Sequence, residues 1–378
     1  MAAEYLVLGM MSGSSLDGLD LAICRLRLDP GAERLVPDWE ILAAETDAYP
    51  PPWRARLRSA PALPGRELWR LHTDYGRWVG QRARAFLDRH PQYAPTLAGS
   101  HGHTVFHHPE AAFTTQIGDG AALANALGLP TVTELRGADL AHGGQGAPLA
   151  PLADLHLFPA HPAFLNLGGI ANISVRQPDG TFSAGDVSGC CQVLDRLAER
   201  AGLAFDADGA LARSGRIVPD FAAALDLPYH QQPYPKSLDN AWVREVLWPK
   251  IEKLPATPAD LLHSFAHWLA QQIVHDLLLL GAAAGAGEGT RSKVLVTGGG
   301  ARNSFLLDGL QQAAQDQQAP FSFEAPASMI GDFKEAALIA LAALLRVEGL
   351  PNALASATGA RLDTINGALY LPALSLPN

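Results

Sequence analysis

Apolar side chains along the chain follow two different periods, and these periods predict strands and helices in alternation. Residues 5–8 form a short apolar run that ends at a glycine, and residues 19–28 alternate apolar and polar positions, so both are expected to be β-strands. Residues 67–89 carry apolar side chains at helical spacing, which predicts a helix packed against a sheet. The strand–turn–strand pattern of the opening recurs over residues 163–175. The sequence therefore predicts an α/β protein whose two halves begin in the same way.

The remaining periodic segments extend this prediction. Asp119 is expected to cap a short helix that follows it. Amphipathic spacing predicts a long helix over residues 258–280. A β-run at residues 293–297 leads through three glycines into a helix at 305–314, and a last helix is expected over residues 336–347.

Length and composition indicate a globular enzyme. The 378 residues are enough for two domains, and 48% hydrophobic with 17% charged residues is typical of an α/β enzyme. The net charge of −10 argues against sequence-independent binding to nucleic acid, which needs clustered Lys and Arg. The chain shows no basic signal-peptide start and no apolar run long enough to span a bilayer, and its 3 cysteines have no zinc-like or disulfide spacing. We expect a cytoplasmic protein with neither nucleic-acid nor membrane partners.

The turn between the first two strands is the first candidate for chemistry. Its small residues let several backbone N–H groups approach an anion, and its serines add hydroxyl donors. Asp17 and Asp20 can hold a Mg²⁺ ion or its waters beside that anion. An ordinary Ser–Gly hairpin turn has the same composition, whereas a Walker loop is excluded because no Gly-Lys-Ser/Thr follows. The candidate residues of this turn are Gly13, Ser14, Ser15, Leu16, Asp17, Gly18, Leu19 and Asp20.

Two later polar segments carry further candidates. His101 and His103 alternate on an extended segment, but no carboxylate or cysteine nearby completes a metal shell, and imidazoles at a strand end often orient a substrate. Arg136 lies in a glycine-dense loop of a kind that carries function more often than structure. Arg136 is a candidate ligand for an anion or a hydroxyl group, and a salt bridge to Asp139 is the alternative.

The second half supplies a candidate base and a candidate purine platform. Asp186 comes shortly before a helix expected from about residue 191, where a carboxylate is usually a cap. In a cleft opposite a phosphate loop, the same carboxylate would instead be placed to take a proton. Lys236 is a candidate anion contact. Backbone without side chains, which packing against a purine or a phosphate requires, is offered by Gly298, Gly299 and Gly300, although three glycines also make a plain loop.

Six motifs occur in the order in which one known family has them. They span nearly the whole chain, and on them the sequence resembles the anhydro-N-acetylmuramic acid kinase family of the actin and sugar-kinase ATPase superfamily. The motifs are Gly-Met-Met-Ser-Gly-Ser-Ser-Leu-Asp-Gly-Leu-Asp from Gly9, Ser-His-Gly-His-Thr-Val from Ser100, Gln-Ile-Gly-Asp-Gly from Gln116, Gly-Gly-Gln-Gly-Ala-Pro from Gly143, Leu-Asn-Leu-Gly-Gly-Ile-Ala-Asn from Leu165 and Thr-Gly-Gly-Gly-Ala-Arg-Asn from Thr297.

The resemblance implies a fold and an activity. The implied fold is α/β, with two actin-like (ribonuclease-H-like) domains flanking an interdomain cleft for nucleotide and sugar. We expect residues 1–133 with 350–378 in the first domain and residues 134–349 in the second. The family uses ATP and Mg²⁺ to open the ring of 1,6-anhydro-N-acetylmuramic acid by hydrolysis and to phosphorylate O6, which gives N-acetylmuramic acid 6-phosphate in peptidoglycan recycling. The implied partners are ATP and an amino sugar, and a homodimer remains open.

The resemblance also assigns roles to residues of this chain. The ATP phosphates are expected on residues 13–20 and the adenosine near residues 298–300. Further nucleotide contacts are expected from Gly168, Gly169 and Asn303, and sugar contacts from His101, Arg136, Gln145 and Glu335.

The family's catalytic aspartate opens a segment Asp-Thr-Gly-Pro-Gly-Asn, and a second aspartate follows nine positions on. Asp186 and Asp195 keep this register, so Asp186 is the expected base. Three departures lie on the sugar side: Ser-Gly-Cys-Cys from Ser188 replaces Gly-Pro-Gly-Asn, His103 replaces a Gln, and Leu-Asp-Asn from Leu238 replaces Gly-Arg-Glu. Two alternatives therefore stay open, a kinase for a different anhydro or amino sugar and a non-catalytic ATP-binding regulator, and the retained aspartate argues against the second.

Overall fold

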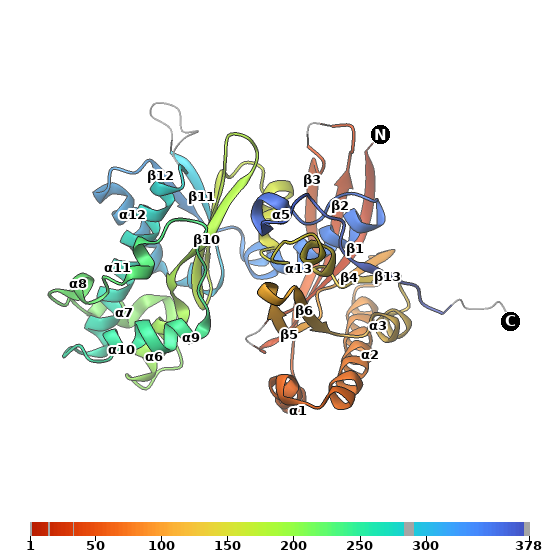
Figure 1. The fold of residues 1–378 in the computed structure, drawn as a ribbon, viewed down its shortest axis with the longest axis horizontal. Coiled ribbons are helices and arrows are strands. Elements are labelled where there is room, and N and C mark those ends of the chain that lie inside the picture. Colours follow the sequence, from red (N-terminus) through yellow and green to blue (C-terminus); the bar gives the residue numbers. More distant parts are fainter. Residues whose placement is uncertain (1, 14–15, 33, 283–290, 374–378) are drawn as a thin grey trace. The chain divides into compact units, whose positions relative to one another are not determined.

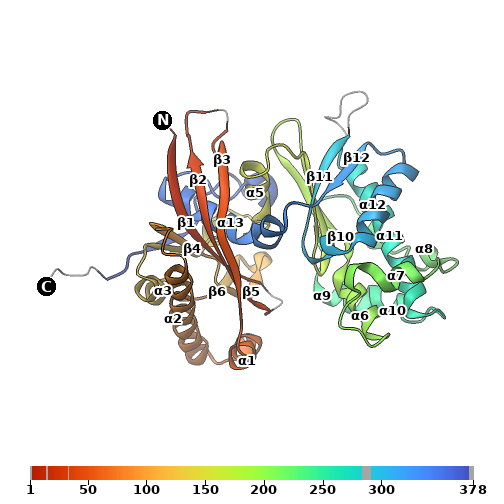
Figure 2. The same cartoon turned by 180° about the vertical axis from the view of Figure 1, so that it is seen from behind.

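The chain forms two compact units, each built around its own sheet (Figures 1 and 2). Unit 1 consists of Met1–Phe158 and Phe333–Asn378, and unit 2 consists of Pro159–Asp332. None of the helices described is long and apolar enough to cross a membrane. The structure is a computed structural model that describes residues 2–13, 16–32, 34–282 and 291–373.

Unit 1 is built on a six-stranded mixed sheet of order β13-β7-β4-β1-β2-β3. Strands β1, β2 and β3 form an antiparallel meander, while β4 and β7 run parallel to β1 on its other side, and β5 with β6 forms a separate hairpin. The middle of β1 and most of β2 are buried, as expected for strands covered on both faces. The strands are β1 (Ala3–Ser12), β2 (Gly18–Leu28), β3 (Asp38–Ala48), β4 (Leu97–Ser100), β5 (His103–His108), β6 (Phe113–Ile117), β7 (Thr131–Thr133) and β13 (Ala368–Tyr370).

Helices supply the rest of the unit 1 core. The apolar stripe of α2 includes the buried Leu71, Tyr75, Val79 and Phe86, and this helix lies beside α3 (Figures 1 and 2). The side chain of Asp119 accepts from the Ala122 N–H (2.8 Å), which confirms the cap predicted for α3. The helices are α1 (Pro51–Ser59), α2 (Gly65–Arg89), α3 (Gly120–Leu127), α4 (Gly137–Ala141), α5 (Ala150–His156), α13 (Ser328–Val347), which enters unit 1 at Phe333, and α14 (Ala355–Thr358).

Unit 2 is built on a five-stranded sheet of order β10-β9-β8-β11-β12. Strands β8, β9 and β10 form an antiparallel meander, and β11 and β12 continue parallel to β8. The long helix α11 supplies much of the core, with Phe265, Leu269, Ile273 and Leu277 fully buried. The strands are β8 (Ala163–Leu167), β9 (Ile170–Arg176), β10 (Phe182–Gly189), β11 (Ser292–Thr297) and β12 (Phe321–Glu324). The α-helices are α6 (Cys191–Glu199), α7 (Ala210–Ser214), α8 (Phe221–Ala224), α9 (Asn240–Trp242), α10 (Trp248–Ile251), α11 (Pro258–Leu279) and α12 (Ser304–Asp316).

The two sheets repeat one topology. In each, three antiparallel strands come first, and the next two strands add in parallel beside the first strand of the three. This strand order, 3-2-1-4-5 with the second strand reversed, is the ribonuclease-H-like arrangement, to which unit 1 adds β13 as an edge strand. The prediction of an α/β fold with two such bodies is confirmed.

The boundaries of the two compact units differ from the domain boundaries expected from the sequence. That expectation puts residues 134–158 and 333–349 in the second domain, whereas both segments belong to unit 1. Contacts between distant parts of the sequence explain this. Gln145 N–H donates to the Thr358 carbonyl (2.9 Å), which ties residues 134–158 to the end of the chain, and Lys334 Nζ contacts Asp154 Oδ1 at 2.5 Å, which ties residues 333–349 to that first segment.

Gly9 lets β1 lie directly against α13. A Cβ atom at this position would lie 1.8 Å from the Ala336 carbonyl oxygen, a separation that real structures do not tolerate. Replacing Gly9 with Ala must therefore push the helix and the strand apart.

Gly9→Ala is expected to lower the free energy of unfolding by at least about 1–3 kcal/mol, the usual range for overpacking. Urea unfolding measures the change. Gly31→Ala is the matched control, because the nearest atom to its added Cβ is 3.7 Å away, and it is expected to stay within about 0.5 kcal/mol of wild type. Equal stability of the two variants would contradict the close approach of β1 and α13.

Candidate active site

The turn between β1 and β2 carries the predicted phosphate contacts, and part of it is described. Ser14 and Ser15 lie outside the described residues. The Gly13 carbonyl accepts from the Leu16 N–H (3.4 Å), and Leu16 has a left-handed φ of 60°. A leucine in this conformation is strained, and such strain is concentrated at functional turns. The side chains of Leu16 and Leu19 are buried in the unit 1 core, so only their backbone can face a phosphate.

The two aspartates of this turn suit a Mg²⁺ ion that arrives with a phosphate. Asp17 is exposed, and half-buried Asp20 accepts from Thr46 Oγ1 through Oδ1 (2.6 Å). Proteins usually hold Mg²⁺ with one or two carboxylates together with phosphate oxygens. Within the described ranges, no group of three or more His, Cys, Asp or Glu side chains gathers as a metal cage. Gly18 has a packing role, because a Cβ there would lie 2.6 Å from Thr46 Cγ2.

A buried chain of hydroxyl groups supports the start of the turn. Tyr49 OH donates to Ser12 Oγ (2.8 Å) and lies 2.5 Å from Tyr75 OH, and Ser12 Oγ lies 3.2 Å from His103 Nδ1. Burial raises the pKa of Tyr49 and lowers the pKa of His103, so both side chains are neutral near pH 7. Neutral His103 can accept from Ser12, and it therefore anchors the residue that precedes the turn.

Arg136 and His101, two of the predicted sugar contacts, are in direct contact. Arg136 Nε donates to His101 Nε2 (3.0 Å), and Arg136 Nη1 donates to the Gly146 carbonyl (2.7 Å). Because Nε2 accepts, the proton of His101 sits on Nδ1, which donates to the Gly102 carbonyl (3.1 Å). Burial and then the charge of Arg136 lower the pKa of His101 to about 3, so the imidazole is neutral. Burial lowers the pKa of Arg136 to about 10, which leaves it charged at neutral pH.

Asp139 has partners other than Arg136. Its Oδ2 accepts from the Gly146 N–H (2.7 Å), and its Oδ1 accepts from Thr358 Oγ1 (2.7 Å). The salt bridge weighed as an alternative for Arg136 is therefore replaced by the contacts to His101 and Gly146.

The other two predicted sugar contacts also lie in unit 1. Gln145 has an exposed side chain on the loop that follows α4. Glu335 lies on α13. Its side chain reaches solvent, although protein atoms surround most of it. These surroundings, followed by the charge of Asp20, raise the pKa of Glu335, and the charge of Arg136 opposes the rise. The charges of Asp20 and Arg136 thus both act on Glu335 within this unit.

Two predicted nucleotide contacts, Gly168 and Gly169, form the turn between β8 and β9 in unit 2. Their carbonyls accept from the N–H groups of Cys191 (3.0 Å) and Cys190 (2.8 Å), at the start of α6. The turn therefore fixes where this helix begins.

The glycine turn after β11 presents open backbone. Gly298 needs to be glycine, because its φ is 85° and a Cβ would lie 2.7 Å from Asn166 Oδ1. A Cβ on Gly299 would meet no atom within 4 Å, so this residue offers a flat, uncovered surface that suits a purine ring. Gly300 packs on Leu167, and the side chain of Asn303 caps α12 by accepting from the Leu306 N–H (3.1 Å).

Asp186 lies near the end of β10 at a bulge. The pairing with β9 shifts between Asp186 and Ser188, and such bulges re-aim a side chain. Asp186 N–H donates to the Lys236 carbonyl (2.9 Å), and its own carbonyl accepts from Tyr229 OH (2.8 Å). The Leu238 N–H donates to the carboxylate Oδ2 (2.7 Å). Burial raises the pKa of Asp186, and the bond from Leu238 opposes the rise.

Asp186 does not cap α6, because the N-cap position is Cys190. Asp195 lies within α6, where burial and then the charge of Glu199 raise its pKa. The capping alternative for Asp186 is removed, and its interpretation as a proton acceptor remains.

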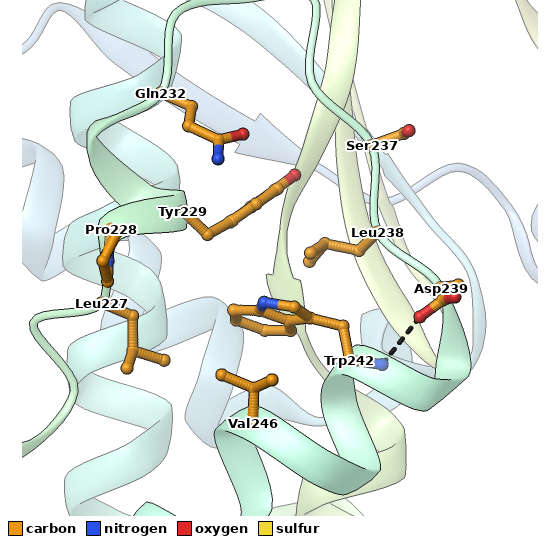
Figure 3. A pocket seen from close by; sticks show the side chains of 9 residues that line it. All are labelled: Leu227, Pro228, Tyr229, Gln232, Ser237, Leu238, Asp239, Trp242 and Val246. Atoms are coloured by element: carbon orange, nitrogen blue, oxygen red, sulfur yellow. Dashed lines mark hydrogen bonds between the residues drawn. The ribbon is translucent and has the colours of Figure 1, made fainter.

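A hollow of about 620 Å³ borders the segment that holds Asp186 (Figure 3). The rings of Tyr229 and Trp242 meet in its wall, with centroids 5.1 Å apart. Asp239 Oδ1 accepts from the main-chain N–H of Trp242 (2.7 Å) at the start of α9, the bond drawn in Figure 3. Two of the wall residues, Tyr229 and Leu238, also bond to Asp186.

The structure corrects one expectation and adds residues that sequence reasoning missed. Lys236 is buried and paired with Asp276, so it is not an open anion contact. Asp276 was detectable, since it continues the stripe Leu262, Leu269 and Ile273 at helical spacing on α11. A charged residue on an apolar stripe predicts a buried partner, but nothing in the sequence identifies that partner.

The family model and the curated relatives that match this chain carry one name and cover almost its full length. A family model described as anhydro-N-acetylmuramic acid kinase matches residues 5–372. A protein of that name from Rhodospirillum rubrum is 34% identical, over 97% of this chain and 94% of the relative. Another, from Streptomyces coelicolor, is 33% identical over 96% and 93%. Among solved structures, (R)-2-hydroxyglutaryl-CoA dehydratase component A of Acidaminococcus fermentans aligns with 13% identity and a TM-score of 0.42, covering 91% of this chain and 99% of that one.

The repeated sheet topology defines a protein of the actin and sugar-kinase class. Within that class, the chain belongs to the anhydro-N-acetylmuramic acid kinase family. The resemblance drawn from the six motifs is confirmed.

Replacing His101 with Gln is expected to flatten the pH dependence of stability. Folded His101 binds a proton only near pH 3, whereas an unfolded imidazole does so near pH 6.5. As the pH falls through 6.5, the unfolded state gains a proton that the folded state does not. Wild type therefore loses about 1.4 kcal/mol through this group between about pH 7.5 and 5.5. Gln lacks this proton, and its oxygen can still accept from Arg136. Urea unfolding at both pH values measures the difference, and equal losses in the two proteins would contradict the buried, neutral imidazole.

Proposed function

We propose that this chain is an ATP-dependent kinase that opens 1,6-anhydro-N-acetylmuramic acid by hydrolysis and phosphorylates O6, giving N-acetylmuramic acid 6-phosphate in peptidoglycan recycling. Membership of the family supports the substrate, and the relatives that carry this name are matched over nearly their whole length. The geometry at Asp186 supports the chemistry, because the strand bulges at this residue, two hydrogen bonds hold its main chain, and a third, from the Leu238 N–H, orients its carboxylate.

Asp186 is assigned the role of base. Its Oδ2 is engaged by the Leu238 N–H, and Oδ1 is the oxygen assigned to the attacking water. The carboxylate takes one proton of that water as the water oxygen bonds to C1 and the C1–O6 bond breaks. O6 leaves with the electron pair of that bond and attacks the γ-phosphorus of ATP, whose bond to the β–γ bridging oxygen breaks, so that ADP leaves with that electron pair. A base held in one orientation contributes by general base catalysis and by positioning.

The remaining contacts are assigned from what the family resemblance implies. Residues 13–20 take the phosphates, with Asp17 and Asp20 as Mg²⁺ ligands, and bound Mg²⁺ would neutralise charge on the phosphates during transfer. The glycines 168–169 and 298–300 with Asn303 take the nucleoside. Arg136, oriented by His101 and Gly146, donates to the sugar, together with Gln145 and Glu335. A cytoplasmic location is part of this proposal, because ATP is the second substrate.

Neither alternative gains a supporting observation. A regulator without catalysis has no need for a half-buried carboxylate oriented by the Leu238 N–H, and the relatives matched over nearly the whole chain carry the name of the anhydro-N-acetylmuramic acid kinase. A panel that measures ADP release with anhydro-N-acetylmuramic acid, N-acetylmuramic acid and N-acetylglucosamine decides the sugar. The anhydro sugar is expected to give the highest kcat/KM, and a higher value for either other sugar would contradict the proposal.

ATP with Mg²⁺ is expected to raise the melting temperature, because a ligand that binds only the folded state stabilises it. Gly299→Trp should abolish this shift by covering the proposed purine surface, and it should still fold, since the added side chain meets open space. Gly65→Trp is the matched control, because its position is equally open, and it should keep the shift. A full shift in Gly299→Trp would overturn the purine assignment.

Asp186→Asn keeps size and hydrogen-bonding reach but cannot take a proton. ATP and sugar should still bind, while turnover falls by at least about 10²-fold, the usual scale for losing a general base. In wild type, the rate should fall on the acid side from a higher pH than for an ordinary aspartate, because the pKa of Asp186 is raised and its protonated form is inactive. Reaction in ¹⁸O-labelled water should place the label on C1. Label in the phosphate, or wild-type turnover in the variant, would rule the mechanism out.

A further inference from the structure

Lys236 and Asp276 form an ion pair in the interior of unit 2. Lys236 Nζ lies 3.3 Å from Asp276 Oδ2, and each side chain is only 2% exposed. Tyr234 OH donates to the same Oδ2 (2.7 Å), and Nζ donates to the His230 carbonyl (3.3 Å). Nζ also lies over the ring of Tyr234, 4.7 Å from its centroid. The pair is therefore fully enclosed and bonded on both sides.

A buried ion pair of this kind is a weak device for stability. Removing two charges from water offsets much of their mutual attraction, and well-packed apolar residues of similar volume often stabilise a fold as well or better. A bonded ion pair does, however, allow only one geometry. The role of the pair therefore depends on which part of the structure it holds in place.

Lys236 is the residue whose main chain supports the proposed base. Its carbonyl accepts from the Asp186 N–H (2.9 Å), and two residues later the Leu238 N–H donates to the Asp186 carboxylate (2.7 Å). A shift of this short segment would move the carboxylate and one of its hydrogen bonds together.

Asp276 supplies a fixed anchor point. It lies on α11, between the fully buried Ile273 and Leu277 in the core of unit 2. A connection therefore runs from the core helix through Asp276 to Lys236, and from the main chain of Lys236 to Asp186.

The outer side of the segment has little support. Ser237 and Leu238 line the hollow of about 620 Å³ drawn in Figure 3. On the strand side, the segment lies so close to β10 that a Cβ on Gly185 would be 2.6 Å from the Lys236 carbonyl oxygen. With open space on one face and bare backbone on the other, the segment is linked to the core helix α11 by the side chains of Lys236 and Tyr234.

We propose that Lys236 and Asp276 are positioning residues for Asp186. Their ion pair fixes the segment that hydrogen-bonds the base, and neither residue is proposed to touch ATP or sugar. This inference rests on the proposed function, in which Asp186 is the base.

The test compares single and double variants of the full chain. Lys236→Met and Asp276→Asn each leave one buried charge unpaired, so both should lower the melting temperature and kcat. The double variant has no unpaired charge, and its Asn can still accept from Tyr234, so its melting temperature should recover. Its kcat should stay about 10- to 100-fold below wild type, the scale of a misplaced catalytic group, while KM for ATP and for sugar changes by less than about 3-fold. A wild-type kcat in the double variant would show that the pair is only structural and would overturn the proposal.

Two variants complete the comparison. Tyr234→Phe removes one bond to Asp276 and keeps both charges, so it should fold and lose kcat several-fold at unchanged KM; an unchanged kcat would count against the proposal. Lys293→Met with Glu324→Gln removes a half-exposed ion pair of the same unit, whose atoms are 3.0 Å apart, and should leave kcat unchanged. A loss of kcat there equal to that of the buried double variant would mean that any charge removal in this unit has the same effect.

The last step separates this proposal from the assignment of Asp186. In an Asp186→Asn background, the buried double variant should lower kcat by less than about 2-fold further, because the pair acts through the base. Multiplying losses would overturn the positioning role while leaving Asp186 as the base. If Asp186→Asn alone turns over at the wild-type rate, the proposed function fails instead. Hydrogen exchange at the Leu238 amide still tests the tether in that case, and protection there should fall in the double variant.

Discussion

Main-chain segments approach one another in both units so closely that no side chain fits between them, and much of the structure depends on this constraint. In unit 1, α13 lies on β1 and β4 at Gly9 and Gly99, where a Cβ would be 1.8 Å and 2.6 Å from a carbonyl oxygen of the helix. In unit 2, Gly185 gives the same close approach between β10 and the segment that holds Asp186. The same device thus sets the packing of a core helix and the position of the proposed base.

The elements with strong periodic patterns could be predicted, and those whose pattern depends on their surroundings could not. β1, β2, α2 and α11 appear where alternation or helical spacing indicates them. The strand β3 lies at a sheet edge, and the alternation that begins with Trp39 and Ile41 is interrupted by the run Leu42–Ala44, so its sequence lacks a clear strand pattern. The helix α13 begins at Ser328, earlier than expected, because a short helical segment over residues 328–332 precedes the irregular φ of −115° at Phe333.

The candidate site likewise contains residues that could be predicted from the sequence and contacts that could not. Arg136, His101 and Asp186 could be singled out from residue type and context, but their partners come from distant parts of the chain or from main-chain atoms. The Arg136–His101 contact joins residues 35 positions apart, and the bond from Leu238 to Asp186 spans 52 positions. Pairing across such distances is set by the sheet topology, which no local pattern encodes. The hydrogen bond between Ser12 and His103 was missed for the same reason.

The segment around Asp186 holds it through the Lys236 carbonyl and the Leu238 amide, groups that every residue except proline supplies in full. Ser237, Leu238 and Asp239 line the neighbouring hollow, and the Asp239 side chain also caps α9. The side chain of Leu238 can therefore be exchanged without losing the hydrogen bond to the base, in keeping with a leucine at the first position of the Leu-Asp-Asn run, where the family usually has glycine. For protein engineering, Ser237 and Leu238 are two positions on the wall of the hollow that can be randomised to seek new acceptors while the main-chain groups that hold Asp186 stay constant.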